Sequence, residues 1–465
     1  MTSYALQKTK KMIKYIYIIF SEVKMNHLKH TVGIFTLGCK VNQYESEAIA
    51  EKFEERGLSV LPHDRKCDVY VINTCTVTAE SDRKARQFIR RAINKNPSAY
   101  ILVTGCLSQT DPESVAAISG VDLVCGNTDK LSVVDAAISL IEGGKKSEHP
   151  VIVVNDIDSA DFETMNIKKF DRTRAYIKIE DGCESHCAYC IIPQARGKIR
   201  SRAPRDVLRE VCHFVQNGCR EVVLTGIETA SYGKDLDSYS LADLLCDIDK
   251  IEGDFTVRLG SLDPSSMNQA FVDKIKGLSK LAPHFHISMQ SGSSRTLRNM
   301  RRKYNADQAL ANIERIREAI VGVRFTTDII VGFPGESDAD FEETLEFSKR
   351  VGFLMIHVFP YSTRKNTPAA SAPDQVSQEV KKARSARLIA LQNEIRSREF
   401  DRILDENKTH SVLFESFDNG VACGHTRDFL EVRVSSDVAL NGEILDVILT
   451  SHNGETFFGN ILDKA

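Results

Sequence analysis

The sequence predicts an α/β protein built on parallel sheets, with a small antiparallel β-barrel at its carboxyl end. Apolar runs alternate with amphipathic helical segments from about residue 31 to residue 405, the pattern of parallel strands joined by helices. From about Lys408 the period changes to the apolar–polar alternation of half-buried strands. A chain of 465 residues is long enough for about two to four domains.

The first region is expected to begin near Thr31 and to hold four strands separated by helices. In the helix over Gln43–Arg56 the apolar side chains share one face, and Gly57 supplies the stop. The polar segment Gly143–Phe170 is expected to be a connector, apart from the apolar run Val151–Val154. The expected strands are Val32–Leu37, Asp68–Asn73, Ala99–Thr104 and Val121–Val124, and the second helix is Glu80–Asn94.

A second series of six strand–helix units is expected to form a partial βα barrel, because a complete barrel has eight. Its strands are Ala175–Ile179, Glu221–Thr225, Thr256–Leu259, His284–Met289, Arg324–Val331 and Met355–Phe359. Its helices include Arg205–Asn217, Leu241–Ile251, Gln269–Leu278, Ala306–Ala319, Asp338–Arg350 and the charged Val380–Leu404. The final barrel is expected to use Ser411–Glu415, Phe429–Val434, Ile444–Thr450 and Thr456–Ile461.

Composition and charge narrow the class of protein. An apolar fraction of 42% argues against a disordered chain, and 12 cysteines are too few for a disulfide scaffold of this length. The net charge of −3 excludes a uniformly basic nucleic-acid coat but not local basic patches. Residues 1–30 carry six lysines against one glutamate, whereas residues 401–465 carry five basic against twelve acidic side chains.

Neither a secretory signal nor a membrane span is expected. Met12–Val23 is apolar, but a span needs about 20 residues and no cleavage site follows. Residues 1–30 are expected to form an extension outside the fold, with Met25 as an alternative start. Clustered thiols then suit a reducing cytoplasm, where they serve as metal ligands or redox groups.

The strongest motif is Cys183-x₃-Cys187-x₂-Cys190, directly after the strand expected over Ala175–Ile179. Three thiolates on one short loop can hold three corners of a cubane iron–sulfur cluster and leave the fourth iron open to a small molecule. The alternative is a zinc site in which His186 joins the three cysteines. The position of the loop at the start of a βα barrel favours the iron–sulfur cluster.

Cys39, Cys75 and Cys106 each follow an expected strand with one residue between. Their spacings of 36 and 31 residues are about one βα unit, so they are expected to converge at the carboxyl edge of the sheet. This pattern favours a second three-cysteine cluster over three unrelated core thiols. Cys125 also follows a strand and is a weaker candidate for a fourth ligand, the alternative being an inert thiol. The packing thiols are Cys67, Cys212, Cys219, Cys246 and Cys423.

The chain resembles the methylthiotransferase family of radical S-adenosylmethionine (SAM) enzymes over about residues 31–465. The resemblance rests on many motifs in the family's order. They are TLGCKVNQYESE (36–47), NTCTVTAESDRKARQ (73–87), GCESHCAYCIIPQARGKIRSR (182–202), LTGIE (224–228), RLGSLDP (258–264), HISMQSGSSRTLRNMRRKY (286–304), TTDIIVGFPGES (326–337) and HVFPYSTRKNTPAA (357–370).

The resemblance implies both a fold and cofactors. It implies a flavodoxin-like parallel-sheet domain over residues 31–145, a connector over 146–170, a partial (β/α)₆ radical SAM barrel over 171–405 and a TRAM β-barrel over 406–465. It also implies two 4Fe-4S clusters. The implied ligands are Cys183, Cys187 and Cys190 for the cluster that binds SAM, and Cys39, Cys75 and Cys106 for the cluster that supplies or carries sulfur.

The resemblance implies a methylthio group placed on an adenine carbon, a C–H replacement beyond the strength of any side-chain acid or base. Lys40-Val41-Asn42 looks like the branch acting on N6-threonylcarbamoyladenosine next to the tRNA anticodon, at position 37. The branches acting on isopentenyladenosine or on a ribosomal-protein aspartate favour Gln-Met-Asn or Pro-Lys-Asn there, and both stay as alternatives. A non-enzymatic alternative is a zinc-stabilised RNA-binding protein.

SAM is expected at the carboxyl ends of the barrel strands. Glu228 is a candidate acceptor for the SAM ammonium group, Phe359 for packing against adenine, and Tyr189 stands where the family favours an aromatic residue. The alternative for each is packing of the barrel mouth. The candidates are Tyr189, Gly226, Glu228, Ser261, Gln290, Ser291 and Phe359.

Contacts with tRNA phosphates are expected from basic residues that follow the cluster loop and the fourth barrel strand. The alternative is a solvated face, and Arg196 or Arg202 alternatively serves the SAM site. The candidates are Arg196, Lys198, Arg200, Arg202, Arg295, Arg298, Arg301, Arg302 and Lys303. An electron donor and a sulfur source are further expected partners of a monomer without membrane contact. The acidic terminal barrel departs from the charge usual for an RNA-binding module.

Overall fold

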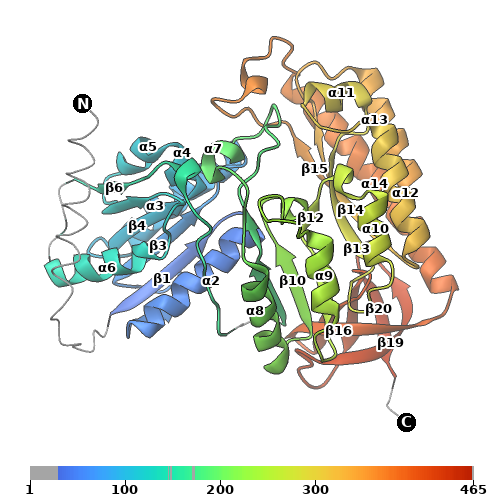
Figure 1. Cartoon of the computed structure of the whole chain (residues 1–465), viewed down its shortest axis with the longest axis horizontal. Helices are drawn as coiled ribbons and strands as arrows, with labels where there is room; N and C mark the ends of the chain where they lie inside the picture. Colours follow the sequence, from blue (N-terminus) through green and yellow to red (C-terminus); the bar gives the residue numbers. More distant parts are fainter. Residues whose placement is uncertain (1–29, 145, 147–148, 170–172, 463–465) are drawn as a thin grey trace.

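The computed structural model describes residues 30–144, 146, 149–169 and 173–462 (Figure 1). The expectations for the amino-terminal extension, including Met12–Val23 and Met25, lie outside these ranges. Within them, no helix combines the length and the apolar character needed to cross a membrane. The strands fall into a parallel sheet, a partial βα barrel and a closed terminal barrel, with a further two-stranded antiparallel sheet of β8 (Glu180–Asp181) and β9 (Arg200–Ser201).

The first sheet has six parallel strands in the order β2-β1-β3-β4-β5-β6, which extends the flavodoxin order by one edge strand. The strands are β1 (Thr31–Thr36), β2 (Ser59–Leu61), β3 (Val69–Thr74), β4 (Tyr100–Gly105), β5 (Leu123–Cys125) and β6 (Val151–Val153). Strand β2 was not expected, and β6 lies in the segment that we expected to be a connector. Both strands are short and lie at the two edges of the sheet.

Helices cover both faces of this sheet. Apolar side chains of α2 (Lys40–Glu55) and α6 (Ser132–Gly143) pack on one face. Those of α3 (Ala79–Lys95), α4 (Cys106–Thr110) and α5 (Pro112–Ala116) pack on the other. Because successive strand residues point to opposite faces, β3 is buried on both sides along its whole length.

The partial barrel consists of two parallel sheets, β7-β10-β11 and β12-β13-β14-β15. Its strands are β7 (Arg174–Lys178), β10 (Glu221–Thr225), β11 (Thr256–Leu259), β12 (Ser261–Leu262), β13 (His284–Gln290), β14 (Arg324–Val331) and β15 (Met355–Pro360). The outer helices are α8 (Pro204–Gln216), α9 (Leu241–Asp249), α10 (Gln269–Ile275), α11 (Ser294–Asn299), α12 (Ala306–Ala319), α13 (Asp338–Val351) and α14 (Gln378–Asp405). Figure 1 shows them along the outer side of the strands.

The inner face of the partial barrel is largely polar. Along β13, Phe285, Ile287 and Met289 belong to the apolar core shared with the outer helices. The alternate residues, including His284 and His286, therefore face inward. The interior of a complete βα barrel is usually filled by branched apolar side chains, so this lumen is suited to a polar occupant.

The terminal barrel is closed, with the strand order β16-β17-β18-β20-β19. Its strands are β16 (Thr409–Asp418), β17 (Val421–Thr426), β18 (Glu431–Ser435), β19 (Ile444–His452) and β20 (Phe457–Ile461). Strand β17 was not expected, and β18 and β20 pair in parallel rather than antiparallel. Phe429, in the loop before β18, stacks on His284 with 4.4 Å between ring centroids and so closes the floor of the partial barrel.

Candidate functional site

Cys39, Cys75 and Cys106 meet at the carboxyl edge of the first sheet. Cys75 and Cys106 directly follow β3 and β4, and Cys39 caps the start of α2 in an extended conformation. Gly38 has φ +101°, and a Cβ built there would lie 2.8 Å from Cys75 Sγ. Gly105 also has φ +101°, and its Cβ would lie 2.5 Å from the Thr74 nitrogen. The two glycines allow the loops to pack closely enough for the cysteines to converge.

The three thiols also interact electrostatically. Burial raises the pKa of Cys75 to about 12, and the neighbouring Cys106 and Cys39 add to the effect. Burial likewise raises the pKa of Cys39, while the positive charge of Arg196 opposes it. Cys125, the last residue of β5, packs in the apolar core of the sheet instead. It therefore lies where an inert thiol would lie.

The loop with Cys183, Cys187 and Cys190 follows β7 and the two-residue strand β8 (Glu180–Asp181). The Cys183 nitrogen donates to the Gly197 carbonyl at 3.0 Å, and the Ile192 nitrogen donates to Cys190 Sγ at 3.4 Å. Burial raises the pKa of Cys190 to about 12, and the other two thiols add to this.

A single zinc ion does not fit this loop as it stands. Zinc binds thiolates at about 2.3 Å, so its ligand atoms lie at most about 4.6 Å apart. In the part of the chain that the structure describes, the one group of three candidate ligands within 4.8 Å is His286, Asp328 and His357. The three cysteines of the loop do not form such a group, with or without His186, so at least two of the ligand atoms lie more than 4.8 Å apart.

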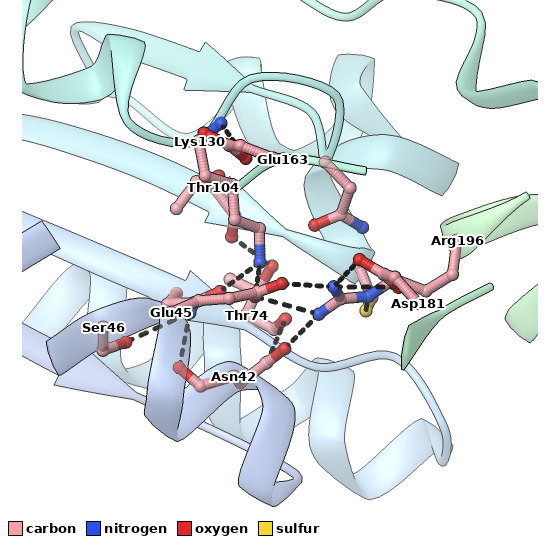
Figure 2. A network of polar contacts seen from close by, with 12 residues as sticks. Asn42, Glu45, Ser46, Thr74, Thr104, Lys130, Glu163, Asp181 and Arg196 are labelled. Atoms are coloured by element: carbon pink, nitrogen blue, oxygen red, sulfur yellow. Dashed lines mark hydrogen bonds and ion pairs between the residues drawn. The ribbon is translucent and has the colours of Figure 1, made fainter. Parts of the chain in front are cut away.

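A buried network of charges lies behind the first set of cysteines (Figure 2). Glu45 of α2 pairs with Lys130, with Lys178 at 2.7 Å and with Arg196 at 2.5 Å. Asp181 also pairs with Lys178, at 2.6 Å, and with Arg196, at 3.1 Å. Arg200 adds a fourth cation, 3.7 Å from Asp181, and Glu163 adds a third carboxylate, which accepts from the Lys130 backbone nitrogen at 3.0 Å. Four cations thus face three carboxylates, and a further anionic group at this place would be stabilised.

The short helix α7 (Ile192–Arg196) connects the two cysteine sets. It begins two residues after Cys190, and its last residue, Arg196, donates through Nε to Cys106 Sγ at 3.3 Å. Five helical residues span about 7.5 Å. The two sets of thiols therefore face the same small region between the sheet and the partial barrel.

Arg302 has the corresponding place beside the other set. It donates to Cys187 Sγ at 3.3 Å, to Asp263 at 2.8 Å and to the Ser288 carbonyl at 2.8 Å. Each set of cysteines therefore has one buried guanidinium that donates to a sulfur. Hydrogen bonds from cations stabilise thiolate ligands and tune the clusters that they hold.

Four of the nine expected RNA-binding residues are largely enclosed by protein. Arg196 and Arg302 contact cysteines, Arg202 pairs with Glu210, and Arg200 donates to the Arg196 and Lys198 carbonyls. A guanidinium held in this way does not reach an RNA phosphate, so these four positions hold the fold and the site together. The exposed candidates are Lys198, Arg295, Arg298, Arg301 and Lys303, although Arg295 also donates to Asp340 and to the Gly335 carbonyl.

Glu228 is the expected SAM contact whose surroundings fit best. It lines a cavity of about 430 Å³ together with Ser185 of the cluster loop, Asp263 and Lys303. Its Oε1 atom is buried and has no hydrogen-bond partner, so it is available to an ammonium group. Burial, with a contribution from Asp263, raises the pKa of Glu228 to about 7.

The other expected SAM contacts differ in their surroundings. A Cβ at Gly226 would lie 2.5 Å from Glu180 Oε2, so a larger residue there would require the Glu180 side chain to shift. Ser261 bonds to Ser288, and the Ser291 hydroxyl is shared with Thr344 at 3.2 Å. Three further residues remain candidates for contact with SAM. Tyr189 is half-buried and Phe359 is exposed. Gln290 adopts an uncommon positive φ of 68°.

Sequence reasoning missed the charged pairs behind the cysteines and a polar cluster inside the partial barrel. Glu45, Lys130 and Asp181 come from separate segments, so no local pattern links them. His286, Asp328 and His357 did leave a signal, because each is a polar residue within an otherwise apolar strand.

Comparisons with known proteins agree with this architecture. Residues 177–348 match the radical SAM superfamily, and residues 31–126 match a family described as uncharacterized protein family UPF0004. A solved structure of the radical S-adenosylmethionine methyltransferase TsrM from Kitasatospora setae superimposes with a TM-score of 0.53. It is 15% identical and covers 74% of this chain and 75% of its own, which shows likeness of fold alone. The expected fold class is confirmed.

Three curated relatives cover most of the chain. Threonylcarbamoyladenosine tRNA methylthiotransferase MtaB of Bacillus subtilis is 40% identical, covering 90% of this chain and 93% of its own. The protein of the same name from Thermotoga maritima is also 40% identical, covering 86% and 90%. The tRNA-2-methylthio-N(6)-dimethylallyladenosine synthase of Acetivibrio thermocellus is 33% identical, covering 92% and 90%.

Proposed function

Because the chain belongs to the methylthiotransferase family of radical SAM enzymes, we propose that it converts N6-threonylcarbamoyladenosine at tRNA position 37 to its 2-methylthio derivative. The relatives at 40% identity carry the name of this activity. The structural observation that carries the proposal is the pair of three-cysteine sets joined by α7. Such a pair suits a reaction that needs both a radical and a sulfur source.

A radical SAM protein binds SAM and a 4Fe-4S cluster, and we assign that cluster to Cys183, Cys187 and Cys190. We assign a second 4Fe-4S cluster to Cys39, Cys75 and Cys106. The excess of buried positive charge next to Cys106 supports this second assignment, because a cluster with thiolate ligands is anionic. When bound, SAM and the clusters supply the radical and sulfur chemistry that no side chain provides.

The residues of the chain then bind and orient the reactants. Arg302 and Arg196 each donate to a ligand sulfur and so fix the position of Cys187 and Cys106. Glu228 Oε1 would accept a hydrogen bond from the SAM ammonium group, and the exposed Phe359 would pack against the SAM adenine. Both side chains lie at the carboxyl ends of barrel strands, where βα barrels place their active sites.

We propose that the tRNA anticodon loop binds over the mouth of the partial barrel. Single-stranded loops can present an unstacked base to a protein, and basic side chains neutralise the neighbouring phosphates. The exposed candidates near the mouth are Lys198, Arg295, Arg298, Arg301 and Lys303. We assign residues 31–145, 171–405 and 406–465 to the three domains, and a cytoplasmic monomer as the working form. The segment 146–170 connects the first two domains, but its strand β6 belongs to the first sheet.

Mass spectrometry of tRNA nucleosides from a strain that lacks the gene tests this function. We expect 2-methylthio-N6-threonylcarbamoyladenosine to be lost and its unmethylthiolated precursor to accumulate. The wild-type gene is expected to restore the product, whereas genes with Cys187→Ala or Cys75→Ala are not. Loss of the methylthio derivative of isopentenyladenosine instead would contradict the proposed substrate. Persistence of every methylthio nucleoside, with no second such enzyme present, would contradict the activity.

A further inference from the structure

Helix α3 of the first sheet carries a basic surface that the sequence analysis did not consider. The helix has six basic side chains against two acidic ones. Both acidic side chains are paired in its first turn, Glu80 with Arg83 at 2.6 Å and Asp82 with Arg364 at 2.7 Å. The excess of positive charge therefore lies along the rest of the helix.

The outer face of α3 presents cations that have no acidic partner. These are Lys84, Arg90, Arg91 and Lys95, and all four are exposed. None of them forms an ion pair with another residue that the structure describes. Helix positions seven and eleven residues apart share one face, so Lys84, Arg91 and Lys95 form a row about 16 Å long. Such a row is free to neutralise a chain of anions.

Aromatic rings border this row. A cavity of about 160 Å³ is lined by Phe35, His63, Phe88, Arg91 and Lys95, among other residues. The half-buried rings of Phe35 and Phe88 stack with 3.6 Å between centroids, and the Arg91 guanidinium lies 5.9 Å from the Phe88 ring. Aromatic rings beside cations are the surface on which unpaired nucleic-acid bases stack.

A second, larger hollow lies along the same face of α3. Its volume is about 490 Å³, and its lining is Arg83, Gln87, Arg90, Arg91 and Asn94. The planar guanidinium group matches two phosphate oxygens at once. Side-chain amides donate and accept, so they can bind ribose hydroxyls. This lining suits a sugar–phosphate backbone.

The helix begins at the mouth of the partial barrel. The Ala79 nitrogen donates to the Ser362 hydroxyl at 3.1 Å, and Arg364 donates to the Thr76 hydroxyl at 2.6 Å. Ser362 and Arg364 follow β15, and Thr76 directly follows Cys75. From there α3 extends along the first sheet for 17 residues, about 25 Å (Figure 1). An RNA whose reacting base lies at the mouth can continue along the helix.

We propose that the outer face of α3, with Lys84, Arg90, Arg91 and Lys95, binds the phosphate backbone of the tRNA beyond the anticodon loop. The inference rests on the proposed function and adds a contact surface on the first domain to the basic residues near the mouth. An acidic protein is the other class of partner that these charges attract. The aromatic-lined cavity and the amide groups favour RNA, which presents bases and ribose hydroxyls.

The test measures the Kd of full-length, cluster-loaded protein for tRNA with N6-threonylcarbamoyladenosine, by fluorescence anisotropy over a range of salt concentrations. The variant combines Lys84→Gln, Arg91→Gln and Lys95→Gln. A single-stranded oligonucleotide with the anticodon-loop sequence alone is measured in parallel. Methylthio transfer is assayed with either an acidic electron-transfer protein or dithionite as the reductant.

The matched control removes two lysines and one arginine from the outer helices of the partial barrel, as Lys250→Gln, Lys349→Gln and Arg350→Gln. These exposed side chains lie at the carboxyl ends of α9 and α13. Helices of a βα barrel run back from the mouth, so their carboxyl ends are distant from it. Iron content and thermal unfolding show that both triple variants are folded and loaded.

We expect the α3 variant to raise the Kd for tRNA about 10-fold at about 0.15 M salt, since each exposed ion contact contributes modestly. The slope of log Kd against log salt should fall by about two to three, one lost phosphate contact for each cation. The control variant should keep both wild-type values. The loop oligonucleotide should bind the α3 variant and the wild type equally, because it ends before the row of cations.

Three outcomes separate the inference from the proposed function. An α3 variant with the wild-type Kd and salt slope for tRNA would overturn the inference and leave the function standing. Unchanged tRNA binding, with a loss of activity that dithionite restores, would assign the surface to an acidic electron donor and also overturn the inference. A wild type that binds tRNA through α3 but transfers no methylthio group would contradict the function and support the surface.

Discussion

Glu45 is a single carboxylate that holds three cations, Lys130, Lys178 and Arg196, in the interior between the first sheet and the partial barrel. Its charge is stabilised by these partners, which together outweigh burial and hold its pKa well below the usual range. Removing the carboxylate would leave Lys130 without its ion pair, while Lys178, Arg196 and Arg200 would share Asp181. Residues that lie far apart in the sequence thus form one buried network of ion pairs, and the stability of the fold depends on the balance of charge within it.

We therefore expect Glu45→Gln to lower the free energy of unfolding by about 3–5 kcal/mol, the cost of breaking a buried ion pair. Denaturant unfolding of the cluster-loaded protein, followed by circular dichroism, measures the change. Glu54→Gln is the control, since Glu54 pairs with Lys169 at the surface of the same helix. A change below about 1 kcal/mol in Glu45→Gln would show that the network does not stabilise the fold.

At Glu228, unlike Glu45, burial outweighs the attraction of nearby cations and raises the pKa from 4.5 to about 7. A carboxyl group with a raised folded pKa binds its proton more tightly in the folded state. The contribution of Glu228 to stability is therefore largest below about pH 4.5 and is lost as the pH rises through about 7. A residue kept at this cost is expected to serve a ligand, which fits its unpartnered oxygen.

For the SAM-free protein we expect Glu228→Gln to raise the free energy of unfolding by about 3 kcal/mol at pH 8 and by less than about 1 kcal/mol at pH 5. In the presence of SAM the order should reverse, because SAM should stabilise the wild type more than the variant. Thermal unfolding at both pH values, with and without SAM, measures both effects. Equal stabilisation by SAM in the two proteins would remove Glu228 from the SAM site.

Helix α2 shows how a loop conformation positions an element and its chemistry. We expected the helix to begin at Gln43, but it begins at Lys40, because Cys39 is already in the extended conformation of a cap. Gly38 makes this possible through its positive φ and its contact with Cys75. The apolar face identified in the sequence predicted correctly which side of the helix packs against the sheet. It did not predict the first turn of the helix.

Gly38→Ala should affect one set of cysteines and leave the other intact. Its Cβ would lie 2.6 Å from Cys75 Cβ at φ +101°, so the loop must move away. We expect the variant to lose the iron of the second cluster and keep that of the SAM-binding cluster, which halves the iron content per chain. Gly57→Ala is the matched control, because Gly57 has φ +83° with no atom within 4 Å of its Cβ. Full iron content in Gly38→Ala would contradict the assignment.

Sequence patterns located most elements because their cause is local. All six long strands of the partial barrel lie within one residue of the expected bounds, since each combines an apolar run with a turn signal. Strand β17 was missed, because Val421–Thr426 contains glycine and little apolar alternation. Arg196 and Arg302 resembled exposed phosphate contacts in the sequence. Their burial depends on partners far along the chain, such as Glu45 and Asp263, which no local pattern reveals.

At the scale of the whole molecule, the terminal barrel closes the floor of the partial barrel. Phe429 stacks on His284 and lies 5.0 Å from the Arg258 guanidinium. The end of α14 makes a second attachment, because Phe400 and Ile403 pack in the core of the terminal barrel. Deleting residues 408–465 would therefore open the floor as well as remove a possible RNA contact, so point variants are the cleaner probe.

Phe429→Ala should weaken this attachment without removing the terminal barrel. The side chain is half-buried, so we expect a loss of about 2 kcal/mol, below the 3–5 kcal/mol typical of a fully buried Phe→Ala change. Calorimetry should show the terminal barrel unfolding at a lower temperature than the rest of the chain. Phe458→Ala, at an exposed position of the same barrel, should leave a single transition. A single unchanged transition in Phe429→Ala would show that the two barrels are coupled elsewhere.

The start of α2 has a consequence for protein engineering. Between Gly38 and Glu45 the chain supplies a proposed cluster ligand, the stretch Lys40-Val41-Asn42 that resembles one substrate branch, and the centre of the buried charge network. Because these side chains share one and a half helical turns, a change at one position shifts the others. Exchanging substrate preference between relatives should therefore succeed with grafts of the whole segment, and piecemeal swaps inside it should give poorly loaded proteins.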